Sequence, residues 1–217
     1  TLMPDAQARE FGFELRRVLT GFKYIGGQIA RLEDAGHVED FIFGFEESYG
    51  YMSGAHVRDK DAINACMLIC QMAQWHKNNG HDLVEAMEEL YQHYGYYLNK
   101  TINVSYPGSA GAKKMAETMD GLRSSAPKVI ADFPVKDFKD YVQGVAMPAV
   151  NYSDPEEQTL PNANVLEFTL DEGIKVLIRP SGTEPKIKAY VFAKGETRKE
   201  AEELLEKLST AASERLD

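Results

Sequence analysis

The sequence predicts an α/β protein in two parts: a three-layer βαβ-type domain with a mainly parallel sheet, then a smaller α+β domain with an antiparallel sheet. Two observations predict this. Over residues 1–45, short apolar runs alternate with helical patterns, which is typical of parallel strands joined by helices. After Tyr97, strands return through tight turns instead. The predicted domains are therefore residues 1–97 and 98–217.

The first domain is expected to run β-α-β-α-β over residues 1–3, 4–11, 13–18, 23–32 and 41–45. Pro4 suits a first helical turn, and Gly12 and Gly36 suit helix ends. Ligands of parallel sheets bind at the carboxyl ends of the strands. These ends correspond here to the loops 19–23 and 44–60.

Two helices should follow, one over about residues 60–77 and one capped by Asp82 with Glu85. Each has an apolar stripe at helical spacing, which we interpret as core. The stripes consist of Ile63, Cys66, Met67, Cys70 and Ala73 or Gln74, and of Leu83, Met87, Leu90, Tyr91 and Tyr94. Two buried free thiols indicate a reducing compartment. A metal pair is the alternative, but no histidine spacing supports it.

The second domain should begin with a strand at 102–106 and a helix over 112–123. Residues 124–161 are irregular apart from a weak strand near Tyr141. A hairpin is then expected from 166–170 and 174–178 around the turn 171–173. A strand at 187–192 and a helix opened by a Thr197/Glu200 capping box complete the domain.

The charge balance limits the function classes. The chain has 24 basic and 34 acidic residues, a net charge of −10, which disfavours binding to nucleic acid. No apolar stretch is long enough to span a membrane and the first residues do not resemble a secretion signal, so we expect a cytoplasmic protein without membrane contact. An anionic ligand would need a local group of donors.

Such a group stands at residues 179–186. Arg179 can grip two phosphate oxygens, Ser181 and Thr183 offer hydroxyls, and Gly182 lets backbone amides face a ligand. Lys186 and Lys188 add positive charge. The segment is either a phosphate cradle or an ordinary solvated turn.

A second candidate is the loop 44–51, in which Glu46 and Ser48 can bind sugar hydroxyls; the alternative is a solvated acidic loop. In the cluster 56–61, Lys60 can serve as a proton donor, or the cluster only caps the helix that starts at Asp61. The strand end Thr20-Gly21-Phe22-Lys23 again offers a hydroxyl, a glycine and a base.

In their joint order, these segments resemble the C-terminal half, the third and fourth domains, of an α-D-phosphohexomutase of the phosphoglucomutase and phosphomannomutase family. The runs Arg-Pro-Ser-Gly-Thr-Glu-Pro and Glu-Glu-Ser-Tyr-Gly-Tyr carry the resemblance, the latter being similar to the phosphoglucomutase and phosphopentomutase branch. The resemblance implies a TATA-box-binding-protein-like fold for the last domain.

The resemblance also implies residue roles. Thr20, Gly21 and Lys23 match a specificity loop, Glu46 and Ser48 a sugar-binding loop, and Lys60 a general acid/base lysine. Phosphate-binding positions are matched by Arg179, Ser181, Gly182 and Thr183. Family members move phosphate between two sugar hydroxyls through a bisphosphorylated intermediate, here glucose 1,6-bisphosphate. Their substrates are phosphorylated hexoses or pentoses.

The family's phosphoserine and magnesium loops do not occur in this sequence. We therefore expect the C-terminal fragment of a phosphoglucomutase-like isomerase, inactive by itself, whose partner is the N-terminal half of the same enzyme with its Mg2+. Alternatives are a non-catalytic phosphosugar-binding or regulatory module, phosphomannomutase or phosphopentomutase specificity, and a plain interaction domain. The sequence leaves the oligomeric state open.

Overall fold

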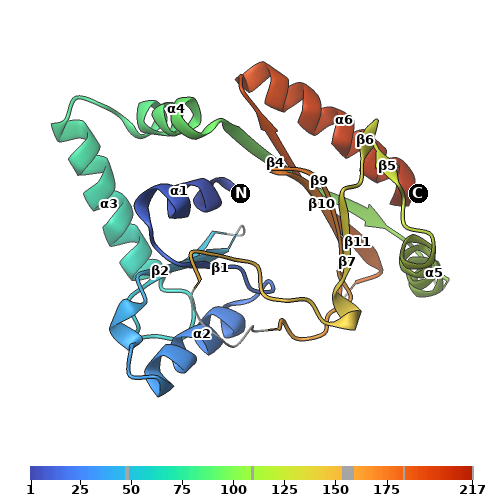
Figure 1. Ribbon diagram of the computed structural model, residues 1–217, viewed down its shortest axis with the longest axis horizontal. Helices are drawn as coiled ribbons and strands as arrows, with labels where there is room; N and C mark the ends of the chain where they lie inside the picture. The colour runs from blue at the N-terminus through green and yellow to red at the C-terminus, as the bar shows by residue number, and fades with distance from the viewer. Residues whose placement is uncertain (47–48, 109, 153–158, 183, 217) are drawn as a thin grey trace. The chain divides into compact units, whose positions relative to one another are not determined.

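The computed structural model describes residues 1–46, 49–108, 110–152, 159–182 and 184–216 (Figure 1). By packing, the chain divides into two compact units. Unit 1 comprises residues 1–16 and 91–217, and unit 2 comprises residues 17–90. None of the described helices is both long and apolar enough to cross a membrane. The domain boundary that the sequence predicts between residues 97 and 98 stays a prediction.

A five-stranded antiparallel sheet with the strand order β4-β11-β10-β9-β7 forms the centre of unit 1. The strands are β4 (Tyr96–Ser105), β7 (Asp137–Asp140), β9 (Leu166–Asp171), β10 (Ile174–Pro180) and β11 (Lys186–Gly195). β9 and β10 form the predicted hairpin, and Gly173 in its turn has a φ of 76°, a left-handed conformation that favours glycine. The antiparallel sheet predicted for the second part is confirmed.

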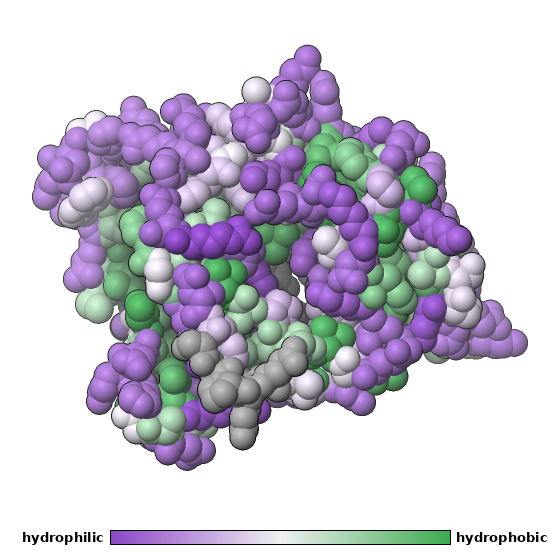
Figure 2. Space-filling model, viewed as in Figure 1, coloured by the Kyte–Doolittle hydropathy of each residue, from purple (hydrophilic) through white to green (hydrophobic). Residues whose placement is uncertain are grey.

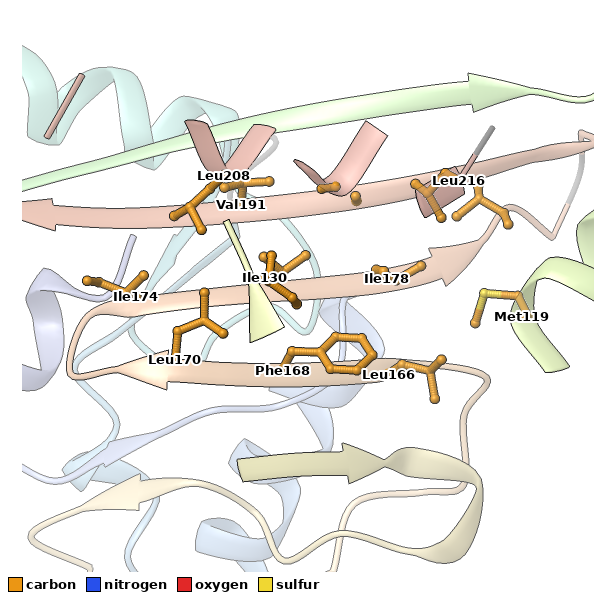
Figure 3. Packing of buried hydrophobic residues seen from close by; sticks show 14 of the residues in the cluster. Met119, Ile130, Leu166, Phe168, Leu170, Ile174, Ile178, Val191, Leu208 and Leu216 are labelled. Carbon is orange, nitrogen blue, oxygen red and sulfur yellow. The ribbon is translucent and has the colours of Figure 1, made fainter. Parts of the chain in front are cut away.

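One face of this sheet packs against α5 (Gly111–Ser124) and α6 (Arg198–Leu216). Figure 3 shows the cluster between them, to which β9, β10, β11 and both helices contribute side chains. Phe168 and Leu208 in this cluster have no exposed surface. The predicted capping box opens α6, because the backbone N–H of Glu200 donates to the Thr197 hydroxyl at 3.2 Å. We call the opposite face of the sheet its outward face.

The beginning of the chain also belongs to unit 1. α1 (Met3–Phe11) starts at a residue that we expected in a strand, so the predicted strand over residues 1–3 is wrong. Pro4 and an acidic side chain in the first turn favour the helix instead. Leu2 and Met3 pack with Tyr97 at one end of the outward face.

Short elements complete unit 1. They are β1 (Leu15–Arg16), β5 (Val129–Ile130), β6 (Phe133–Pro134), η2 (Tyr141–Gln143) and β8 (Ala149–Val150). β1 pairs with β8, and β5 pairs with β6. The weak strand expected near Tyr141 ends one residue earlier, as β7.

Unit 2 contains a helix, a hairpin and a pair of helices. They are α2 (Phe22–Asp34), η1 (Val38–Asp40), β2 (Phe43–Glu46), β3 (Gly50–Ser53), α3 (Ala62–Asn78) and most of α4 (Leu83–Tyr94). Its fully buried cluster is small and consists of Phe22, Ile29 and Met52. Both predicted caps are present, since Asp61 accepts from the backbone of Asn64 and Asp82 exchanges hydrogen bonds with Glu85.

The mixed α/β class is confirmed, but the mainly parallel sheet expected for the first domain is not found. All strand pairs among the described residues are antiparallel. β2 pairs with the adjacent β3, a local closure that costs less chain entropy than a crossover. Alternating apolar runs predicted the elements, but they do not specify which strands pair.

The apolar stripe of α3 is exposed, which contradicts its interpretation as core. Ile63 is 86% exposed and Met67 52%, and α3 has no buried residue. Cys66 and Cys70 are free and exposed, so the inference from buried thiols to a reducing compartment does not hold. Figure 2 shows apolar residues in view among hydrophilic ones on the face it draws.

Candidate functional site

The first candidate site lies where β10 ends and β11 begins, and we call Arg179, Ser181, Gly182 and Lys188 the Arg179 site. Its loop is closed by a hydrogen bond from the backbone N–H of Ser181 to the carbonyl of Lys186 at 2.8 Å. Gly182 is exposed, and a side chain added there would meet nothing within 4 Å. The backbone at Gly182 is therefore open to a ligand. Thr183, also predicted for this site, lies outside the described residues.

Two cations stand side by side in the Arg179 site. Arg179 and Lys188 are directly opposite in the β10–β11 register, and both are half-buried. Their neighbours Ile178 and Ala189 are buried in the core, so both cations belong to the outward face. Within the described part of the chain, no ion pair joins Arg179 or Lys188 to a carboxylate.

Lys186, by contrast, is already neutralised. Its ammonium forms an ion pair with Glu184. The hydrogen bond and the charge of Lys186 lower the pKa of Glu184, and the charge of Lys188 adds to this effect. Of the two lysines expected to add positive charge, the structure thus leaves Lys188 available to an anion.

The second candidate site lies in unit 2, and we call Glu46, Lys60 and Phe22 the Lys60 site. The Lys60 Nζ is 3.9 Å from Glu46 Oε1 and 3.0 Å from Asp59 Oδ1. Backbone and side-chain hydrogen bonds from Lys60 lower the pKa of Asp59. Sugar hydroxyls both donate and accept, so an ammonium beside a carboxylate suits them. Ser48 lies outside the described residues.

The Lys60 site is closely packed beneath its charged groups. The Lys60 Nζ lies 4.9 Å from the centre of the buried Phe22 ring, a cation–π distance. A Cβ at Gly50 would come within 2.5 Å of that ring and within 3.1 Å of both Glu46 and Lys60. Glycine is therefore required at residue 50 for the carboxylate, the ammonium and the ring to meet.

The predicted specificity residues lie beside this site at the start of α2. Gly21 precedes the helix with a φ of 127°. The Lys23 Nζ lies over the ring of Tyr24 at 4.8 Å, and Thr20 is exposed. Phe22 anchors this segment in the core of unit 2 and places its ring under Lys60.

We found no donor set for a divalent metal in the described ranges: no group of three or more His, Cys, Asp or Glu side chains converges there. Asp59 is engaged by Lys60. Asp61 caps α3, and its pKa is lowered by the backbone N–H of Asn64 and by the side chain of His56. These carboxylates therefore do not fit a magnesium site.

Comparison with known proteins matches both parts of the chain to one family. Residues 1–94 match the family model described as phosphoglucomutase/phosphomannomutase, alpha/beta/alpha domain III. Residues 127–211 match the C-terminal domain of the same enzymes. The chain belongs to the phosphoglucomutase/phosphomannomutase family. The resemblance to the C-terminal part of these enzymes, their domains III and IV, is thereby confirmed.

Relatives within the phosphoglucomutase/phosphomannomutase family are longer. A phosphoglucomutase of Staphylococcus aureus (strain bovine RF122 / ET3-1) is 38% identical over 187 residues, 86% of this chain and 33% of its own length. One from Staphylococcus epidermidis (strain ATCC 35984) is 36% identical over 184 residues, again 33% of its length. This chain thus spans about a third of the curated relatives that it matches.

The fold is also found among solved structures. The open form of the exocytosis-sensitive phosphoprotein pp63/parafusin, a phosphoglucomutase from Paramecium, superimposes with a TM-score of 0.54. The match covers 89% of this chain and 33% of the other, at 22% identity. The likeness supports the fold.

Two residues of the sites have roles in the structure that their sequence motifs do not specify, Phe22 and Lys188. The resemblance assigns the segment around Phe22 to a specificity loop, although phenylalanine is among the residues most often buried. Lys188 was weighed equally with Lys186. Lys188 alternates with the buried Ile187 and Ala189, which assigns it to the outward face. Glu184, two residues before Lys186, is the sequence signal for the ion pair that neutralises Lys186.

Proposed function

We propose that this chain is the sugar- and phosphate-binding part of a phosphoglucomutase-like isomerase, which interconverts glucose 1-phosphate and glucose 6-phosphate. One observation carries the proposal: Arg179 and Lys188 are adjacent, half-buried and without an acidic partner among the described residues, next to the open backbone of Gly182. Cations in this setting bind phosphate through charge-assisted hydrogen bonds. The names of the relatives support the same reaction.

The Lys60 site is proposed to bind the sugar. The Glu46 carboxylate accepts hydrogen bonds from ring hydroxyls and the Lys60 ammonium donates to a hydroxyl oxygen, a position from which it can also transfer a proton. Ser48, Thr20, Gly21 and Lys23 are proposed to complete the sugar and specificity contacts. Holding the phosphate that does not react positions the reacting end of the substrate.

The remaining machinery is proposed to reside in the N-terminal half of the same enzyme. Mg2+ is assigned there because the described carboxylates of this chain do not form a metal site. Glucose 1,6-bisphosphate is the proposed intermediate, and the cytoplasm the proposed location.

Calorimetric titration of the 217-residue chain with glucose 6-phosphate tests the proposal. We expect Arg179→Met to lower the affinity by tenfold or more, since a charge-assisted hydrogen bond is worth about 1.5–3 kcal/mol. Arg9→Met is the matched control, because Arg9 forms an exposed ion pair with Glu172 in the same unit. Equal affinities for the two variants would contradict the proposed function.

A non-catalytic phosphosugar-binding module is the second candidate, favoured by the Arg179 and Lys60 sites, whose groups can bind a phosphosugar without reacting with it. Mutase turnover separates the two. We expect no turnover from the chain alone and restored turnover on adding the N-terminal half of a related phosphoglucomutase with Mg2+. Binding without restored turnover would favour the module.

A further inference from the structure

We infer that Lys188 is the residue by which the Arg179 site selects a doubly charged phosphate ester over a singly charged anion of the same shape. The inference rests on the proposed function and names a specificity residue within it. Like charges directly opposite each other on neighbouring strands destabilise a sheet. Arg179 and Lys188 occupy such positions.

Acidic side chains offset the other cations near this part of the outward face. Glu184 pairs with Lys186. Glu167, which is opposite Leu177 and thus two residues along β10 from Arg179, accepts from the Lys175 ammonium at 2.9 Å and from the Tyr141 hydroxyl at 2.8 Å. Both nearby carboxylates are therefore occupied by other partners.

On the side of β11 away from Arg179, the residues nearest to Lys188 on the outward face are uncharged. Lys188 is opposite Asn103 of β4, and the next outward residue along β11, Tyr190, is opposite Thr101. These side chains can accept or donate hydrogen bonds but cannot cancel a charge. An anion bound by Arg179 is thus the group best placed to relieve the repulsion between the two cations.

The number of charges decides which anion fits. A phosphate monoester carries close to two negative charges above pH 7, and one arginine with one lysine balances both. A sulfate monoester has the same tetrahedral shape with one charge. Arg179 alone can grip two oxygens of either ester, so shape does not separate them. The second negative charge of the phosphate is then balanced by the second cation, Lys188.

The experiment compares glucose 6-phosphate with glucose 6-sulfate at pH 8, titrated into the 217-residue chain by calorimetry. We expect the wild-type chain to bind the phosphate at least tenfold more tightly than the sulfate. Lys188→Met should weaken phosphate binding about tenfold, the effect of one charge-assisted contact, and should change sulfate binding much less. The preference should therefore nearly disappear.

Lys194→Met is the matched control. Lys194 is half-buried on the same face of β11, but its ammonium lies over the Tyr97 ring at 5.2 Å, six residues away. It should keep the phosphate preference of the wild type. Lys188→Arg should also keep it, because the charge is retained, and thermal melts of all variants check that they fold.

The outcomes separate the two proposals. If the wild-type chain binds neither ester, the proposed function fails and the inference with it. If it binds both equally, or if Lys188→Met and Lys194→Met keep the same preference, the inference is overturned while phosphosugar binding stands. If Lys188→Met does not fold, loss of the preference must be shown with Lys188→Gln, and an unchanged preference there overturns the inference.

Discussion

The sheet of unit 1 and the helices α3 and α4 of unit 2 carry the same kind of apolar pattern, yet only the sheet buries it. Phe168 and Leu208 have no exposed surface, because alternate strand residues face a stripe of α6. Ile63 in the stripe of α3 is 86% exposed, and Leu83 and Met87 in the stripe of α4 are 37% and 36% exposed, so their interpretation as core is wrong as well. An apolar stripe thus predicts that a helix forms, whereas its burial depends on a partner surface elsewhere in the fold.

The largest effect should come from the buried side of this comparison. Phe168→Ala should lower the free energy of unfolding by about 3–5 kcal/mol, through lost transfer energy and a cavity. Phe45→Ala is the control, since Phe45 is 40% exposed in β2, and it should cost much less. Urea denaturation followed by circular dichroism measures both. Similar losses of unfolding free energy would mean that Phe45 of unit 2 is as well buried as Phe168 of unit 1.

A buried charge network should give the next largest effect. Burial by itself would raise the pKa of Glu167, but the Lys175 ammonium, the Tyr141 hydroxyl and the charge of Lys139 together lower it. Lys175→Met leaves Glu167 buried without its main partner, which should cost about 2–4 kcal/mol at pH 7. Lys136→Met, which breaks an exposed pair with Asp171, should cost far less.

The pH dependence sharpens this prediction. In the wild type the lowered pKa of Glu167 stabilises the fold above the usual value of 4.5, and this contribution is lost as the pH falls below it. In Lys175→Met the pKa of Glu167 should be raised, because its main cationic partner is gone. Protonation of the buried Glu167 carboxyl then reduces the destabilisation of the variant. The difference in unfolding free energy between the two proteins should therefore shrink from pH 7 to pH 4. A constant difference would argue against a charged Glu167.

A helix cap should have a smaller effect. Thr197→Ala removes the hydroxyl that accepts from the backbone N–H of Glu200, and should cost about 1 kcal/mol. The loss should appear in the global unfolding of unit 1 because α6 belongs to its core. Thr210→Ala on the exposed side of α6 serves as control. A cost at Thr210 equal to that at Thr197 would exclude the cap as the cause.

The accuracy of the sequence predictions follows the range of the interactions involved. The capping boxes at Asp82 and Thr197 and the hairpin around Gly173 were predicted because neighbours in sequence make them. Parallel pairing is not found among the described strands and the predicted burial of α3 is wrong, since both depend on surfaces distant in the chain. The same holds for the sites: the residues of the Arg179 loop could be found, whereas the position of Lys188 directly opposite Arg179 and the Phe22 ring under Lys60 needed the fold.

The smallest effect should come from the exposed stripe of α3. Met67→Ala should change the unfolding free energy by no more than about 0.5 kcal/mol, as is usual for surface positions, because Met67 is 52% exposed. Met119→Ala, at a 1% exposed position of α5, should cost about 2 kcal/mol or more. Both changes remove the same atoms from a helix. A large cost at Met67 would mean that the stripe of α3 is covered in solution, and the contrast between the two units would then disappear.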